Sequence, residues 1–168
     1  MSAHSFDTLA SLGAQAAAGA TDHCPFMPVF GAPQVMFAKG QGTELWDTEG
    51  KRYLDFLCGL AVTGLGHAHP AVTEAVASQA STLLHVSNLF ANPVAAQAAV
   101  RVNSLLEEAT GAEGQVFFCN SGAEANEALY KVARCHGHNE GKYEIITTIN
   151  SFHGRTIAGI AATGQDKV

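Results

Sequence analysis

The chain has 168 residues, of which 47% are hydrophobic and 14% charged, so its composition is globular and its length suffices for one modest domain with a hydrophobic core. Its 9 basic against 15 acidic residues give a formal net charge of −6, which argues against nucleic-acid and membrane partners. No lysine or arginine precedes Lys39 and no apolar run reaches membrane-spanning length, so we expect a cytoplasmic protein without a targeting signal.

Residues 34–57 alternate between short apolar runs and turn residues, a pattern typical of a β meander. Its three strands are predicted at 35–37, 44–47 and 52–56. The turns between them are predicted at 40–42 and 48–51, where glycines stand. Three further glycines, at 59, 64 and 66, then predict an irregular loop.

Two helices are predicted next. Pro70 suits the first position of a helix that runs to about His85 with apolar residues at helical spacing. Asn92 followed by Pro93 predicts an N-cap and a first-turn proline, and this second helix is expected to end near Gly111.

From residue 115 the pattern of apolar runs and turns becomes typical of an α/β protein. Residues 115–119 form a short apolar run that predicts a buried strand, 120–122 a tight turn, 123–136 a helix, and 143–149 a second strand rich in β-branched residues. A strand-helix-strand unit predicts a parallel sheet covered on both faces.

This change in the sequence pattern also predicts a domain boundary near residue 90. Residues 1–90 would hold an N-terminal arm, with an Ala/Gly-rich stretch at 14–20, followed by the meander, the loop and a helix. Residues 91–168 would form the start of the α/β domain.

The turn at Ser121 joins a predicted strand to the N-terminus of a predicted helix. This geometry presents free backbone N–H groups and the positive end of the helix dipole, so it is a suitable seat for a phosphate. Ser121 could add a hydroxyl donor, and Gly122 would let the backbone approach closely. From the residues alone an ordinary capped helix remains open, with Ser121 as the N-cap and Glu124 completing a capping box.

Residues 151–156 follow the second predicted strand. In an open parallel sheet ligands bind at the carboxyl ends of the strands, so this loop and the Ser121 turn would share one edge. Phe152 could cover a flat ring, and Arg155 could hold a carboxylate through two hydrogen bonds. The alternative is a core phenylalanine and a surface arginine in an ion pair.

Together the stretches 120–127 and 151–156 closely resemble class III pyridoxal-phosphate aminotransferases, most closely the acetylornithine and ornithine type. The resemblance continues at 42–51, 64–70 and 85–88. It implies an α/β fold, the N-terminal part of a fold-type-I transferase, in which the meander precedes the start of a large domain built on a parallel sheet.

The resemblance also implies roles for single residues. Ser121, Gly122 and Ala123 would hold the phosphate of pyridoxal 5′-phosphate, Phe152 would stack on its pyridine ring, and Arg155 would hold the substrate α-carboxylate. Asn126 and Glu127 would support the site without touching substrate. Phe30 stands where many relatives carry a tyrosine, which removes a possible hydroxyl contact.

The resemblance implies that the covalent chemistry lies outside this chain. None of its lysines matches the position of the family's Schiff-base lysine, which would lie past Val168 with the aspartate that pairs the pyridine nitrogen. We therefore expect no catalytic residue here and an inactive fragment. The intact relative would be a homodimer that transfers the distal amino group of N-acetylornithine, or a close ω-amino acid, to 2-oxoglutarate in arginine biosynthesis.

Other functions remain open at this point. One is another enzyme on the same scaffold, such as an ornithine or succinylornithine aminotransferase, a dialkylglycine decarboxylase or a glutamate-1-semialdehyde aminomutase, although the last has no arginine to match Arg155. Another is a non-catalytic phosphate-binding module, and a third is a structural fragment without a ligand. The histidines at 67–69 and 136–138 lack the spacing of a four-ligand zinc site, so no metal is expected.

Overall fold

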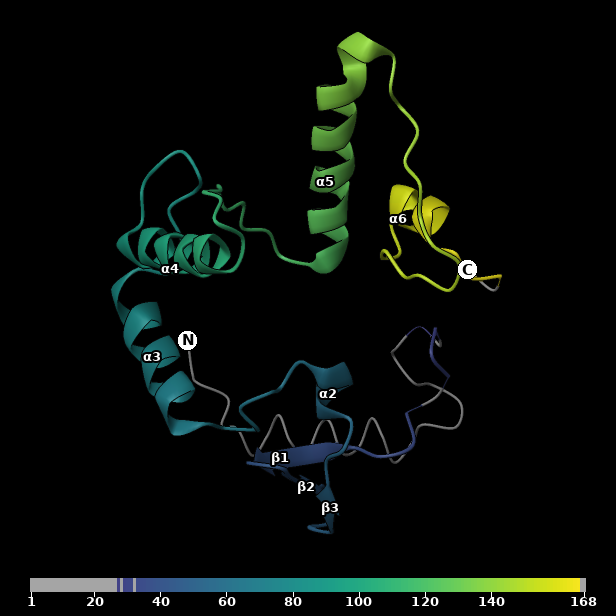
Figure 1. Ribbon diagram of the computed structural model, residues 1–168. Coiled ribbons are helices and arrows are strands. Elements are labelled where there is room, and N and C mark those ends of the chain that lie inside the picture. The colour runs from purple at the N-terminus through teal and green to yellow at the C-terminus, as the bar shows by residue number, and fades with distance from the viewer. Residues whose placement is uncertain (1–26, 28, 32, 167–168) are drawn as a thin grey trace. The chain divides into compact units, whose positions relative to one another are not determined.

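Figure 1 shows the computed structural model of the chain, which describes residues 27, 29–31 and 33–166. Residues 1–26, with the arm predicted around 14–20, lie outside the described residues. The chain divides into two compact units between His85 and Val86. None of the helices within the described ranges has the length and apolar character that crossing a membrane requires.

The first unit contains the predicted meander. Its strands β1 (Phe37–Gln41), β2 (Glu44–Asp47) and β3 (Arg52–Leu54) form an antiparallel sheet in the order β1-β2-β3. The first strand lies later than the predicted 35–37 and includes two residues of the predicted 40–42 turn, because the chain turns instead at Gly42, whose φ is +57°. The second turn forms at 48–51 as predicted, where the Asp47 carboxylate accepts hydrogen bonds from the backbone N–H groups of the turn.

The predicted irregular loop contains one short, distorted turn of helix, α2 (Cys58–Ala61), whose Gly59 and Leu60 have left-handed backbone angles. The loop then returns to the meander, where Gly42 and His67 exchange two backbone hydrogen bonds of 2.9 and 2.8 Å. Helix α3 (Pro70–Thr82) starts at the predicted proline and ends earlier than predicted, because Leu83 is extended.

The second unit begins with α4 (Pro93–Thr110), which matches its prediction at both ends. The Asn92 side chain accepts hydrogen bonds from the N–H groups of Val94 and Ala95, and Gly111 ends the helix in the left-handed conformation at φ +71°. Both termini were predictable because the residues that set them are adjacent to the helix.

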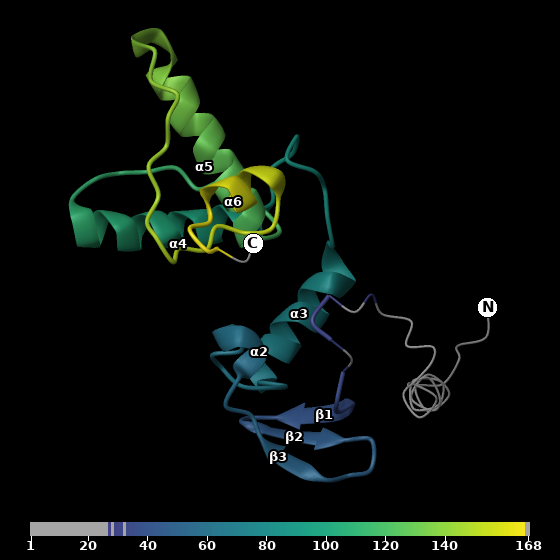
Figure 2. The same ribbon diagram turned by 90° about the vertical axis from the view of Figure 1, so that its right-hand side faces the viewer.

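Helix α5 (Gly122–Gly137) is followed by the 3₁₀ turn η1 (His138–Glu140), after which the chain reverses. Figures 1 and 2 show that it then runs back alongside α5 to the short helix α6 (Ile157–Ala162). Helix α6 was not predicted. The reversal brings the loop at 150–156 back toward the N-terminal end of α5, where the two candidate stretches meet.

The strands predicted at 115–119 and 143–149 are not formed. Both segments lack a regular strand assignment, and the meander is the sheet that the described residues contain. A strand exists only when its N–H and C=O groups pair with a neighbour, and within the described residues neither segment has one. The predicted strand-helix-strand sheet is therefore wrong for these residues, although the helix between the segments is present.

The predicted hydrophobic core is also absent from the described residues. No hydrophobic side chain there is buried, and the buried positions are the glycines Gly137, Gly154 and Gly159. The helices carry apolar side chains, but few other elements pack on them, so these faces meet solvent. The composition predicted a core because it reports how much apolar surface the chain holds, and not whether that surface finds a partner.

Candidate functional site

The N-terminus of α5 is capped by Ser121. Its Oγ accepts a hydrogen bond of 3.2 Å from the N–H of Glu124. The Glu124 carboxylate reaches back to the N–H of Asn120 at 2.5 Å, one residue before the position expected for a capping box. The predicted cap is therefore present in a shifted form, and its geometry fixes the first turn of the helix.

The first turn of α5 also offers donors to a ligand. Gly122 and Ala123 are its first two residues, and a helix has no carbonyl acceptors for the N–H groups at these positions. A Cβ added at Gly122 would meet no atom within 4 Å, so the space in front of the turn is open. The positive end of the helix dipole faces the same space. These donors and this opening fit a phosphate group.

The second stretch presents Phe152 and Arg155 to solvent. The Phe152 side chain is 56% exposed, which excludes the alternative of a core phenylalanine in this structure. The Arg155 guanidinium carbon lies 5.7 Å from the centre of the Phe152 ring, within the range of a cation–π contact. An aromatic face and a guanidinium therefore stand next to each other at one surface.

The structure brings the two stretches together. The Asn126 side-chain amide donates a hydrogen bond of 3.0 Å to the carbonyl of His153, although the two residues are 27 positions apart. Gly154 has φ +108°, and a Cβ added to it would come within 2.9 Å of the Ala123 Cβ. The backbone of the second stretch therefore lies directly against the first turn of α5.

Hydrogen bonds from residues that were not predicted as part of the site hold the second stretch in place. Thr163 Oγ1 accepts a hydrogen bond of 3.1 Å from the N–H of His153, and the N–H of Asn150 donates to the carbonyl of Gly164 at 2.7 Å. Thr156 caps α6 by accepting a hydrogen bond of 3.1 Å from the N–H of Gly159. A threonine directly before an apolar run, here at 157–160, is typical of a helix N-terminus, so this start could have been predicted from the sequence.

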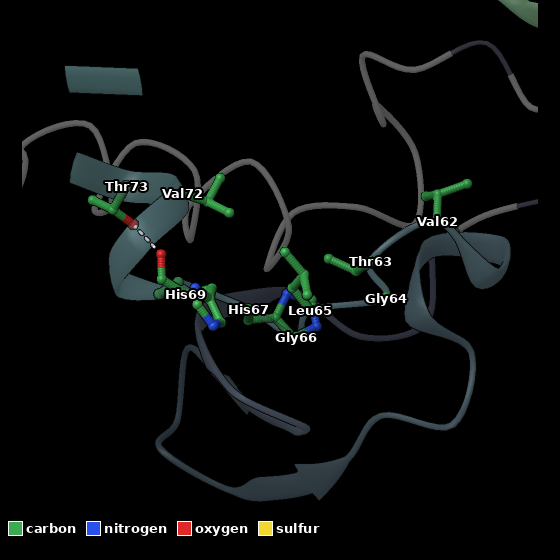
Figure 3. Close-up of a pocket in the computed structure, with 10 residues that line it drawn as sticks. Val62, Thr63, Gly64, Leu65, Gly66, His67, His69, Val72 and Thr73 are labelled. Atoms are coloured by element: carbon green, nitrogen blue, oxygen red, sulfur yellow. Dashed lines mark hydrogen bonds between the residues drawn. The ribbon is translucent and has the colours of Figure 1, made fainter. Parts of the chain in front are cut away.

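The first unit contains a separate hollow with a volume of about 680 Å³, shown in Figure 3. Val62, Leu65 and Val72 contribute apolar walls, and the His69 carbonyl accepts a hydrogen bond of 3.1 Å from Thr73, drawn as a dashed line. No lysine or arginine is among the described residues that line this hollow, so these residues offer no permanent cation to a phosphate or a carboxylate.

His67, at the edge of this hollow, is engaged by a carboxylate. Its Nε2 lies 2.6 Å from Oδ2 of Asp55, whose other oxygen accepts hydrogen bonds from the N–H groups of Cys58 and Leu57. The hydrogen bond with His67, followed by that from Cys58, holds the pKa of the Asp55 carboxyl below its ordinary value. Among the described residues no three His, Cys, Asp or Glu side chains gather as a metal site would require.

Comparison with known proteins agrees with the resemblance seen in the sequence. Residues 29–168 match the family model of class-III aminotransferases. The acetylornithine aminotransferase of Bacillus amyloliquefaciens is 52% identical over 139 residues, which are 83% of this chain and 57% of that protein. The chain therefore spans little more than half the length of this relative.

Solved structures show the same relationship. An aminotransferase of Bacillus anthracis superposes with a TM-score of 0.77 at 32% identity, over 97% of this chain and 36% of that one. An amine transaminase from an uncultivated Pseudomonas species, solved with PLP bound, gives a TM-score of 0.71 at 25% identity, over 80% of this chain and 31% of that one. The predicted fold class, the N-terminal part of a fold-type-I transferase, is thereby confirmed.

Proposed function

The chain belongs to the class-III aminotransferases, a family that uses pyridoxal 5′-phosphate, and we propose that the protein containing it transfers the distal amino group of N-acetylornithine, or a close ω-amino acid, to 2-oxoglutarate. The observation that carries this proposal is the meeting of the α5 N-terminus with the loop at 152–155. A phosphate seat, an aromatic face and a guanidinium then lie in one place. The identity with an acetylornithine aminotransferase supports the choice of donor.

In this proposal Ser121, Gly122 and Ala123 hold the cofactor phosphate. The open N–H groups of the first turn supply hydrogen bonds, and the helix dipole favours the negative charge. Phe152 covers one face of the cofactor ring with its own exposed ring. When bound, pyridoxal 5′-phosphate accepts the amino group and takes up the electrons released during transfer.

Arg155 is proposed to set which substrates are accepted. Its guanidinium can form two parallel hydrogen bonds with an α-carboxylate, which orients the rest of the substrate. Because Arg155 lies beside the Phe152 ring, a carboxylate held there would be close to the ring that Phe152 covers. A donor with a carboxylate at one end and an amine at the other would then turn the distal amine toward the cofactor.

We propose that the lysine which holds the cofactor is neither Lys131 nor Lys142, the lysines described in the second unit. Lys131 lies nine residues beyond Gly122 along α5, about 14 Å at 1.5 Å per residue. Lys142 follows the far end of α5 and pairs with Glu140. Neither stands near the proposed phosphate seat, which supports the expectation that these 168 residues alone do not catalyse transfer.

We further propose that residues 1–90 form the arm and small-domain segment and that 91–168 begin the cofactor-binding domain. The division of the chain between His85 and Val86 lies close to this boundary. A homodimer, a cytoplasmic location and a role in arginine biosynthesis complete the proposal, which the family match and the identity of the Bacillus amyloliquefaciens relative support.

The test is an assay of the gene product that contains this chain. With pyridoxal 5′-phosphate and 2-oxoglutarate it should form glutamate from N-acetylornithine, and more slowly from simple diamines that lack the α-carboxylate. The 168 residues alone should show no turnover in the same assay. Cofactor binding without turnover of any ω-amine donor would favour a non-catalytic module, and turnover of diamines alone would favour a plain amine transaminase.

A further inference from the structure

Asn126 links the two halves of the proposed site. It follows Gly122 by four positions and Ala123 by three, so its side chain lies on the same face of α5 as the proposed phosphate seat. The side chain is partly buried, and its amide donates 3.0 Å to the His153 carbonyl. A carbonyl oxygen can only accept hydrogen bonds, so the Asn126 side chain must turn its amide nitrogen, and not its amide oxygen, toward His153.

The close approach of the Gly154 backbone to Ala123 also holds the loop near α5. Gly154 follows His153 and is held at φ +108°, and a Cβ there would come within 2.9 Å of the Ala123 Cβ and 3.1 Å of its Cα. Because Gly154 has no Cβ, its backbone can lie directly against Ala123, and the hydrogen bond from Asn126 holds the loop there. Together they define one separation between the seat at Gly122 and Ala123 and the ring of Phe152.

We propose that Asn126 is a positioning residue that sets the distance between the phosphate seat and Phe152, an inference that rests on the proposed function. A pyridoxal phosphate has its phosphate at one end and its ring at the other. Both ends bind well at once only if the two subsites are held at the matching distance, since a loose loop must be ordered on binding. Asn126 should therefore matter for a ligand that spans both subsites and not for phosphate alone.

The experiment compares two ligands on the gene product that contains this chain. The first is 4′-deoxypyridoxine 5′-phosphate, which carries the ring and the phosphate but no aldehyde to react with a lysine, and the second is inorganic phosphate. Their affinities are measured by calorimetry for the wild type, Asn126→Ala and Asn126→Asp. Lys131→Ala, an exposed change on the same helix, is the matched control.

Loss of one hydrogen bond predicts that Asn126→Ala binds the ring phosphate roughly tenfold more weakly. Its affinity for inorganic phosphate should stay within about twofold of the wild type. Asn126→Asp should be weaker still for the ring phosphate, because its carboxylate would face the His153 carbonyl. Lys131→Ala should match the wild type for both ligands.

Gly154→Ala provides an independent variant that leaves Asn126 in place. Its added Cβ would push the loop away from Ala123, so it should show the same selective loss for the ring phosphate. Equal losses for both ligands in Asn126→Ala, or no loss for either, would overturn the inference. A wild type that binds inorganic phosphate but gains nothing from the ring would overturn the proposed function as well.

Discussion

Ser121 combines a structural contact with a proposed binding contact. Its Oγ uses a lone pair to accept the N–H of Glu124, which caps α5, and this leaves its own proton free to be donated to a ligand. The capped-helix and phosphate-seat interpretations of this turn are therefore compatible. The same geometry that fixes the first turn of the helix also orients the hydroxyl.

Two substitutions at Ser121 separate these contacts. Aspartate caps helices as well as serine, but its charge would repel a phosphate, so Ser121→Asp should keep the thermal stability and lose most cofactor affinity. Ser121→Ala removes the cap and should cost about 1 kcal/mol of stability, with a smaller loss of affinity. Thermal unfolding and cofactor titration measure the two effects. If Ser121→Asp binds the cofactor normally, the phosphate does not sit at this turn.

Arg155→Ala tests the carboxylate contact. Removing one partner of a charged pair costs about 2–5 kcal/mol, so kcat/KM for N-acetylornithine should fall roughly 30-fold or more. Arg155→Lys should also lose activity, because an ammonium offers a point charge and not a planar pair of donors. Cofactor affinity should change little, since the proposed phosphate seat is formed by other residues.

A diamine without the α-carboxylate is the control substrate for Arg155. Its turnover should be nearly the same in the wild type and in Arg155→Ala. Equal losses for the acid and the diamine would instead show that Arg155 supports the loop, for example through its contact with Phe152.

Much of the proposed site was visible in the sequence because its parts are local. Ser121 and Gly122 predict a helix start, and Phe152 and Arg155 lie three positions apart. The contacts that join these parts were not visible. The hydrogen bond from Asn126 spans 27 positions, and no local pattern specifies which carbonyl it finds.

At the scale of elements, the predictions succeeded where the deciding residues lie within or beside the element. Helix α4 is set by its neighbours Asn92 and Gly111, whose conformations depend on a few adjacent atoms. The segments at 115–119 and 143–149 were wrongly predicted as strands. A strand needs a second segment to pair with, and a local sequence pattern does not show where that partner lies. Helix α6 was missed because six residues give little periodicity.

The loop between β3 and α3 is expected to loosen in acid. The pKa of Asp55 is below its ordinary value in the folded protein, so its stabilising contribution is complete above the unfolded pKa of about 3.9 and is lost as the pH falls through the folded pKa. Between pH 7 and pH 3 the melting temperature of the gene product that contains this chain should therefore fall.

Asp55→Asn removes this titration while it keeps an acceptor for the N–H groups of Leu57 and Cys58. The variant should be less stable than the wild type at pH 7, and the difference should shrink toward pH 3. A difference that stays constant across this range would show that the Asp55–His67 contact does not stabilise the loop through its charge. Thermal melts of both proteins at matched ionic strength provide the comparison.

At the scale of the whole molecule, the described residues form helices and a sheet, but few of their apolar side chains are covered by other described elements. Hydrophobic residues that are at least 86% exposed lie in loops, in the segment at 143–149 and at the start of α6, namely Phe56, Leu89, Ile146, Ile149 and Ile157. Hydrophobic burial is the main favourable term in folding, and a three-stranded meander alone buries little. The secondary structure of the described residues is therefore set locally, without the packing that makes folding cooperative.

The 168 residues by themselves should therefore melt without a sharp transition and should aggregate at micromolar concentration. Circular dichroism should show helix that is lost gradually on heating, and a dye that binds exposed apolar surface should fluoresce before heating. The extended segment at 143–149 should drive part of the association, because an unpaired apolar strand can pair with another chain. Replacing Ile146 and Ile149 with threonine should then raise solubility without changing the helix signal, since neither residue lies in a helix. A sharp, concentration-independent melt of a soluble monomer would contradict this account, because it would require a buried core that the described residues do not form.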